Sequence, residues 1–185
     1  MKIKIILIFI FSIILFYSCG KEEEGKFFDK RDGTMYKTVK IGKTEWLAEN
    51  LNFKCEGSYC YDNNEANCEK YGRLYTWDAA RTASPSGWHL PTDEEWQYLI
   101  NFLGKDSSGI KAMTGGSSGF NALFAGTIQP SGNFYLLGNY TAFWSDKEDN
   151  ANFAWLRYIK PDNNSIGRGS VDKRTGYSVR CVRNY

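Results

Sequence analysis

The sequence predicts an α+β protein in which two helices lie beside a small, twisted antiparallel sheet with long loops. Three observations favour this class. The folded part begins with an alternating segment, its first half has helical periodicity, and its second half has short apolar runs broken by Gly, Ser and Asn. Because strands are expected near both ends of the domain, the terminal strands are predicted to pair.

The first half alternates between extended and helical patterns. Residues 36–41 alternate in polarity, which is typical of a half-buried strand. Residues 41–46 continue this pattern as a hairpin with Gly42 and Lys43 at the turn. A short helix is expected over residues 75–83, because the Ser-Pro-Ser-Gly sequence that follows imposes a turn.

The clearest element is a helix over residues 93–103. Thr92 and Glu95 have the spacing of a capping box, in which each side chain bonds the other residue's free backbone N–H. Gly104 supplies the stop. Four apolar residues have i, i+3, i+4, i+7 spacing and predict one buried face: Trp96, Leu99, Ile100 and Leu103.

The second half contains short apolar segments that are typical of strands separated by turns. The predicted strands are residues 120–125, 134–137, 141–144, 153–159 and 177–182. Basic residues near the end of the chain are offset by acids and are expected on a solvated face: Arg168, Lys173, Arg174, Arg180 and Arg183.

Residues 1–18 have the pattern of an export signal, with a basic start and an apolar run from Ile5 to Tyr17. This run is shorter than the about 20 residues of a transmembrane helix; a short permanent membrane anchor is the alternative. Residues 15–19 resemble the bacterial lipobox, which implies that Cys19 carries lipid and is the first residue of the mature protein. Several acyl chains would hold such a protein on a membrane.

Residues 19–29 are predicted to be a lipidated acidic linker, and residues 30–185 to be one domain. The acidic run after Cys19 resembles the surface-export tag of some Gram-negative lipoproteins, which implies an outer-membrane lipoprotein that faces the cell exterior. A solvated spacer on the periplasmic face is the alternative. Loss of Lys2 and Lys4 leaves 21 basic and 21 acidic side chains, a balance that argues against a nucleic-acid partner.

Four cysteines remain after Cys19, and an even number in an exported domain suggests two disulfides among three possible pairings. Cys60 and Cys68 bracket a short polar loop that a disulfide could close. Cys55 and Cys181 would then tie the early part of the domain to its end. The cysteine spacing and the oxidising compartment argue against a metal site.

Five segments resemble the Fibrobacter succinogenes major paralogous domain family: residues 36–42, 45–52, 71–77, 85–92 and 178–182. They occur in order and cover nearly the whole chain from Asp32 to Asn184. The family is similar in fold to C-type lectin-like domains and to the formylglycine-generating enzyme domain. The resemblance therefore implies a lectin-like α+β fold, in members that are largely surface or secreted proteins without an established activity.

The chain departs from this family at one position that affects the disulfides. The family usually has a cysteine where this chain has Ser84, and in a lectin-like fold that cysteine is expected to bond the one near the end. Cys181 has therefore lost its usual partner. Cys55 is expected to replace it, and a free Cys181 is the alternative.

Lectin-like domains that bind sugar through calcium use a Glu/Gln-Pro-Asn/Asp loop and a Trp-Asn-Asp strand, and this resemblance directs attention to residues 129–150. Asp146 and Glu148 are weak calcium candidates, because calcium needs six to eight oxygens and Ser131 replaces an expected ligand. No metal or cofactor is therefore assigned. The candidate ligand-binding residues are Gln129, Tyr135, Tyr140, Asp146, Glu148, Asp149 and Asn150. Aromatic side chains in this region could stack on sugar rings, although most are expected in the core.

No catalytic residue is assigned. His89 precedes a helix cap, where packing and hydrogen bonding explain it, and no strained nucleophile turn flanks a serine. The predicted function is a non-enzymatic, envelope-anchored module that binds a glycan or another surface protein. The alternatives are an enzyme that uses Asp or Glu side chains on a formylglycine-generating-enzyme-like scaffold, and a purely structural envelope component.

Overall fold

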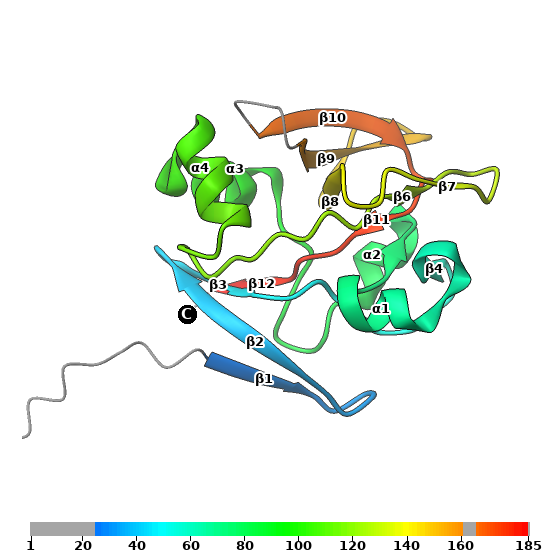
Figure 1. Cartoon of the computed structure of the whole chain (residues 1–185), viewed down its shortest axis with the longest axis horizontal. Coiled ribbons are helices and arrows are strands. Elements are labelled where there is room, and N and C mark those ends of the chain that lie inside the picture. Colours follow the sequence, from blue (N-terminus) through cyan, green and yellow to red (C-terminus); the bar gives the residue numbers. More distant parts are fainter. Residues whose placement is uncertain (1–24, 161–165, 185) are drawn as a thin grey trace, which may run out of the picture.

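The computed structural model describes residues 25–160 and 166–184. Within these ranges, helices and antiparallel sheets are mixed in one unit, so the predicted α+β class is confirmed. Figure 1 shows α3 (Asp93–Leu103) and α4 (Ser107–Thr114) on one side of the molecule and α1 (Glu65–Tyr71) and α2 (Trp77–Ala83) on the other. The predicted export signal and Cys19 lie outside the described residues. None of the described helices has the length and apolarity needed to cross a membrane.

A four-stranded sheet joins the beginning of the described chain to its end. Its order is β1 (Gly25–Asp29), β2 (Thr34–Ile41), β3 (Thr44–Leu47) and β12 (Val182–Asn184), all antiparallel. The predicted hairpin is present, with Gly42 at a positive φ of 61°. The terminal strands share this sheet, although β12 pairs with β3 and not with β1. Strand β1 contains residues that the sequence assigns to the end of the linker, residues 19–29.

A six-stranded sheet forms the second half of the structure. Its central strands β8 (Thr141–Glu148) and β9 (Phe153–Ile159) contain two predicted segments. On one side, β10 (Gly167–Asp172) pairs with β9 and forms an edge of the sheet. On the other side, β8 is followed by β11 (Tyr177–Ser178), β5 (Leu74–Tyr75) and β4 (Ser58–Tyr59), which forms the opposite edge. A separate pair consists of β6 (Thr127–Ile128) and β7 (Phe134–Tyr135).

The described residues form four α-helices, twice the predicted number: α1 (Glu65–Tyr71), α2 (Trp77–Ala83), α3 (Asp93–Leu103) and α4 (Ser107–Thr114). Helix α3 has the predicted bounds and the predicted capping box. Helix α2 begins later than expected, because Tyr75 pairs in a sheet and Thr76 caps the helix. The two missed helices are short and are capped by Asn64 and Asp106.

The buried face of α3 packs into an aromatic core. Trp96 lies 4.9 Å from Trp46 of β3 and 5.5 Å from Phe143 of β8, measured between ring centroids. Phe120 completes this group from a segment between α4 and β6. Aromatic rings at these tilted and edge-on separations attract one another beyond the effect of burial. The core therefore joins both large sheets to α3.

The prediction of a strand at residues 120–125 is wrong, because the Arg180 side chain forms hydrogen bonds with backbone carbonyl groups of that segment. Arg180 is fully buried and donates hydrogen bonds to the carbonyl oxygens of Phe120 and Asn121. Asn121 adopts a positive φ of 52°. Carbonyls held by a side chain are not paired in a β ladder, so the segment stays irregular. The prediction that Arg180 lies on a solvated face is also wrong.

Candidate functional site

The residues proposed for calcium are divided between two places. Asp146 lies near α3, where partial burial of its carboxyl group and the charges of Glu95 and Glu94 raise its pKa. Glu148 instead forms an ion pair with Lys173. A carboxylate that is already neutralised by a lysine is a poorer calcium ligand, so the candidate pair does not form one oxygen cage.

The neighbouring candidates have other local roles. Asp149 accepts a hydrogen bond from the Ser170 hydroxyl at 2.8 Å, and the Asn150 side chain accepts from the backbone N–H of Asn152 at 3.0 Å. Gln129 lies at the end of β6, where its backbone N–H donates to Asn133 at 2.9 Å. Among the described residues, Asp146, Glu148 and Asp149 do not belong to a group of acidic, histidine or cysteine side chains close enough to share a metal ion.

Among the described residues, one group of three metal-ligating side chains is close enough to share an ion: Cys60, Glu65 and Cys68. Cys60 and Cys68 form a disulfide, which confirms this predicted pairing. A disulfide removes both thiolates, and thiolates are the form in which cysteine binds metal. The group is therefore explained by the crosslink.

The other predicted pairing, Cys55–Cys181, is wrong in this structure, where both cysteines are free. Cys181 is fully buried, and its sulfur lies 3.4 Å from the Ser84 hydroxyl oxygen. Burial raises the pKa of the Cys181 thiol to about 12, so the reactive thiolate is scarce. The alternative of a free Cys181 is confirmed, and Ser84 occupies the place beside it.

The two candidate tyrosines have different environments. Tyr140 is half-buried, stacked on Tyr158 at 6.0 Å and close to Tyr177. Tyr135 of β7 is 48% exposed. An aromatic ring with one open face can receive a ligand, whereas a ring packed on both sides contributes to the core. Of the two predicted tyrosines, Tyr135 is therefore the one presented to a ligand.

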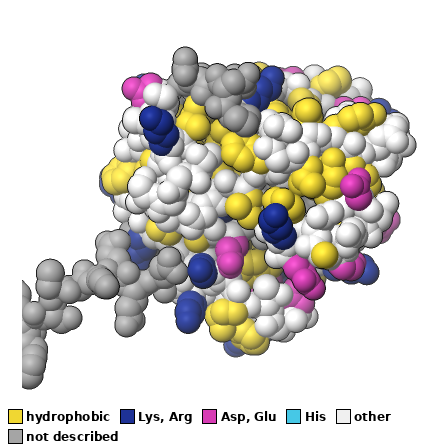
Figure 2. All heavy atoms as spheres, in the orientation of Figure 1, with side chains coloured by type: hydrophobic (Ala, Val, Ile, Leu, Met, Phe, Trp, Pro, Cys, Tyr) yellow, Lys and Arg dark blue, Asp and Glu magenta, His cyan; other side chains and the backbone are white. Residues whose placement is uncertain are grey.

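Tyr135 lines a shallow groove of about 530 Å³. One wall is the turn Tyr61–Asn63 that precedes α1, and the other is the β6–β7 hairpin. Its lining residues are Asp62, Asn63, Gly132, Asn133, Phe134 and Tyr135. Figure 2 shows hydrophobic side chains at the surface on the side of the molecule where β6 and β7 lie in Figure 1.

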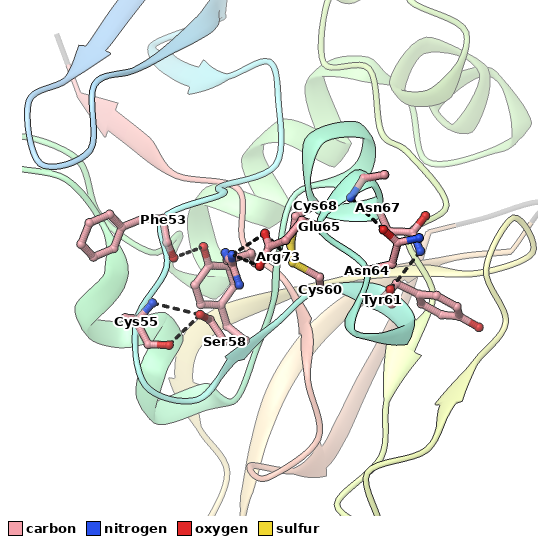
Figure 3. Close-up of a disulfide and its surroundings, with 12 residues drawn as sticks. Phe53, Cys55, Ser58, Cys60, Tyr61, Asn64, Glu65, Asn67, Cys68 and Arg73 are labelled. Carbon is pink, nitrogen blue, oxygen red and sulfur yellow. Dashed lines mark hydrogen bonds and ion pairs between the residues drawn. A yellow bond between two sulfur atoms is a disulfide. The ribbon is translucent and has the colours of Figure 1, made fainter.

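The disulfide holds the first wall in place. Cys60 immediately precedes the turn and Cys68 lies in α1, so the crosslink closes the segment that contains Asp62 and Asn63. Figure 3 shows the Asn67 side chain pointing to the Tyr61 carbonyl, to which it donates at 2.9 Å. Helix, crosslink and side chain together make this wall rigid, and a rigid wall lowers the entropy cost of binding.

The second wall is held by packing against the first. The Phe134 ring lies 5.1 Å from the Tyr61 ring. A β-carbon placed at Gly126 would lie 2.6 Å from the Tyr135 carbonyl oxygen and 2.8 Å from the Tyr61 ring. Gly126, at φ 71°, is thus the residue that lets the hairpin approach the turn.

Backbone strain is concentrated at this groove. Four non-glycine residues of the described chain have positive φ, and two of them, Asp62 and Asn63, line the groove. A third, Leu136, directly follows the lining residue Tyr135 in the chain. Asn and Asp tolerate this conformation, but for leucine it is unfavourable. Strained backbone clusters at ligand-binding sites, where the surrounding structure maintains it. This signal is invisible in the sequence, because neither Asp62 nor Leu136 belongs to a recognisable motif.

A second hollow, of about 330 Å³, lies between β2, the segment after β3 and the end of α1. Met35 and Leu123 contribute apolar side chains to it, and Glu49 and Glu69 contribute carboxylates. Sequence reasoning missed this hollow as well, because its lining comes from four separate segments. It shares no lining residue with the Tyr135 groove.

The Tyr135 groove offers an aromatic face, amide groups from Asn63 and Asn133, and one carboxylate from Asp62. Amides both donate and accept hydrogen bonds, and a carboxylate accepts them. An open surface of this kind suits a neutral, hydroxyl-rich ligand better than a buried apolar one. The groove is therefore chemically suited to binding.

Comparison with known proteins gave one result. The family model described as Fibrobacter succinogenes major domain matches residues 39–183. No curated protein and no solved structure matched the chain. The matched range includes both walls of the groove, α3 and the strands of both large sheets, except β1, the first five residues of β2 and the last residue of β12.

Proposed function

The chain belongs to the Fibrobacter succinogenes major domain family, and from that premise we propose that it is an envelope-anchored, non-enzymatic module that binds a glycan at the Tyr135 groove. The observation that carries the proposal is an exposed aromatic ring on the β6–β7 wall, opposite a disulfide-held turn that bears amide and carboxylate groups. Protein partners on the same surface are the second possibility.

A lectin-like scaffold is part of the proposal. Its support is topological: β12 returns to the sheet that contains β1 and β2, and the binding groove lies on looped segments between short strands. Fold does not by itself give function, so the ligand class rests on the groove and not on the scaffold. Sugars commonly combine a face of C–H groups with a rim of hydroxyls, and this groove offers a partner for each.

The anchor is proposed from residues 1–24 of the sequence. Cys19 would carry the lipid, and the acidic run after it would direct the protein to the outer face of the outer membrane. Lipid labelling should mark the wild type and not Cys19→Ser. Protease applied to intact cells should remove the domain only if it faces outward. Lipid labelling of the Cys19→Ser protein would contradict the anchor. Full protection of the domain from protease would contradict the outward orientation.

Replacing Tyr135 by alanine is expected to weaken glycan binding about 5–160-fold, because stacking on an aromatic side chain contributes about 1–3 kcal/mol. A glycan array on the wild type would identify ligands, and calorimetry would compare the variant on the best one. Phe102→Ala is the matched control, because Phe102 is 59% exposed on α3, outside the groove. Equal losses in both variants, or no ligand on the array, would contradict the proposal.

An enzyme that uses Asp146 is the second candidate function. It is favoured by the raised pKa of the exposed Asp146 carboxyl, caused by desolvation and by the charges of Glu95 and Glu94, because perturbed carboxyl groups are frequent in active sites. A hydrolase screen that compares the wild type with Asp146→Asn and Glu148→Gln would distinguish the enzyme from the binding module. Turnover that Asp146→Asn abolishes would favour the enzyme, and no turnover in any form would favour the binding module.

A further inference from the structure

The β1–β2 hairpin carries a pair of exposed apolar side chains. Phe28 is 50% exposed and Met35 is 54% exposed. The two residues lie directly opposite each other in the antiparallel register, so their side chains share one face of the sheet. Single apolar side chains are common at protein surfaces, whereas neighbouring ones that stay in water are typical of an interaction surface.

Two lysines extend the same face. Lys26 and Lys37 are also directly opposite each other, two residues along each strand, and both are exposed. Because alternate residues of a strand share a face, these lysines lie on the face of Phe28 and Met35. These four residues are called the hairpin patch below.

The hairpin as a whole is basic. Residues 25–44 contain six Lys or Arg and two Asp, an excess of four positive charges. Lys21 and the three glutamates before Gly25 reduce this excess to two over residues 20–44. Figure 2 shows basic and hydrophobic side chains close together at the lower end of the molecule, where the hairpin lies in Figure 1. Apolar side chains in a positive surrounding complement an anionic, partly apolar surface.

The proposed anchor restricts which side of the domain faces the membrane. Cys19 precedes Gly25, the first residue of β1, by six positions. Six residues span at most about 22 Å when fully extended, whereas a domain of this length is about 40 Å across. A tether that is shorter than the domain is wide holds the β1 side of the domain close to the membrane.

We propose that the hairpin patch docks on an anionic phospholipid surface, with Phe28 and Met35 inserted among the headgroups and the lysines beside the phosphates. The proposal rests on the lipid anchor proposed above and goes beyond it, because it gives the domain itself a contact with the membrane. Apolar side chains flanked by lysine are the composition with which folded surfaces bind the interface of such membranes. The lysine stems can lie along the apolar pair while their ammonium groups reach the phosphates.

Docking of the hairpin patch also sets the orientation of the Tyr135 groove. Figure 1 shows β6 and β7 on the side of the molecule opposite to β1 and to the turn between β1 and β2. A domain that rests on its β1–β2 hairpin therefore turns the groove away from the membrane, toward ligands outside it. A freely rotating domain would present the groove in all directions.

The depth of a nitroxide label in the lipidated protein tests the contact. The wild-type lipoprotein is placed in vesicles of phosphatidylcholine and phosphatidylglycerol, with the label at Met35→Cys. Cys55→Ser removes the half-buried free thiol, and Cys181 is fully buried. Collisions with oxygen, which enters the bilayer, are compared with collisions with a water-soluble nickel chelate. The label at position 35 should be largely shielded from the nickel chelate and open to oxygen.

Two matched controls separate docking from simple closeness to the anchor. A label at Phe102→Cys, where the side chain is 59% exposed on α3, should remain open to the nickel chelate. Phe28→Ser should return most of the nickel accessibility to the label at position 35, whereas Phe102→Ser should not change it. In vesicles of phosphatidylcholine alone the shielding should decrease, because the attraction between the lysines and anionic headgroups is lost.

Each other result overturns a definite part of the proposal. A label at position 35 that is as open to the nickel chelate as the label at position 102 overturns the docking and leaves the anchor standing. Shielding that survives Phe28→Ser overturns the assignment to the hairpin patch. Equal shielding in neutral and anionic vesicles overturns the anionic partner. A wild-type protein that does not enter vesicles at all overturns the anchor, and the docking with it.

Discussion

Replacement of Arg180 by methionine is expected to destabilise the protein by about 4 kcal/mol or more, a large part of the roughly 5–15 kcal/mol typical of a folded domain. Arg180 is completely buried between β11 and β12, and its guanidinium donates five hydrogen bonds to neutral oxygens. Methionine fills much of the same volume but donates none of them.

The acceptors of these hydrogen bonds explain the expected size of the effect. They are Asn50 Oδ1 and the carbonyl oxygens of Leu47, Phe120 and Asn121. Each buried acceptor left without a donor costs about 1–3 kcal/mol. The guanidinium also lies 4.4 Å from the centre of the Phe120 ring, an attraction that methionine replaces only in part.

Urea unfolding followed by tryptophan fluorescence measures this loss. Arg174→Met is the matched control, because the Arg174 side chain is 76% exposed and its ion pair with Asp172 lies at the surface; its unfolding midpoint should remain nearly unchanged. Arg180→Lys should fall between the wild type and Arg180→Met, because one ammonium group cannot reach all four acceptors. A loss of less than about 1 kcal/mol in Arg180→Met would show that the carbonyls find other donors.

Arg180 also shows where prediction from the sequence fails. The sequence predicts helix α3 to the residue, because its cap, its apolar spacing and its stop are all local signals within residues 92–104. Arg180 resembles its exposed neighbours in the sequence, and only the tertiary structure places it in the core. The irregular segment around Phe120 has the same cause, since its partner lies 60 residues away.

Only part of the candidate site can be predicted from the sequence. Tyr135 is among the predicted residues, because aromatic side chains in a looped region are an obvious sugar contact. The opposite wall at Asp62 and Asn63 is missed, since it lies far earlier in the chain and is held there by the Cys60–Cys68 crosslink. The calcium set is chosen from closeness in sequence, but the register of β8 shifts between Trp144 and Glu148, and Glu148 is paired with Lys173.

Replacement of Ser84 by cysteine is expected to create a disulfide with Cys181 and to stabilise the protein by up to about 4–5 kcal/mol, the chain-entropy value for a loop of about 100 residues. The two positions are 97 residues apart in sequence, and their side-chain O and S atoms lie 3.4 Å apart. Because Ser84 ends α2 and Cys181 precedes β12, the crosslink would join a helix to the sheet that closes the domain.

Two measurements decide whether the crosslink forms. Thiol titration in denaturant should find one fewer free thiol in oxidised Ser84→Cys than in the wild type, and one more when both proteins are reduced. The unfolding midpoint should rise only in the oxidised form. The double variant Ser84→Cys, Cys181→Ser is the control, because it keeps the new cysteine without its partner, and its midpoint should not respond to oxidant.

The rate of oxidation carries a further expectation. Since the raised pKa of Cys181 makes its thiol unreactive in the folded state, the bond must form during folding, and oxidation of the already folded variant should be slow. Rapid oxidation of the folded protein would contradict the buried, protonated state of Cys181. Pairing of the introduced cysteine with Cys55 would show that positions 84 and 181 do not form a site ready for a disulfide.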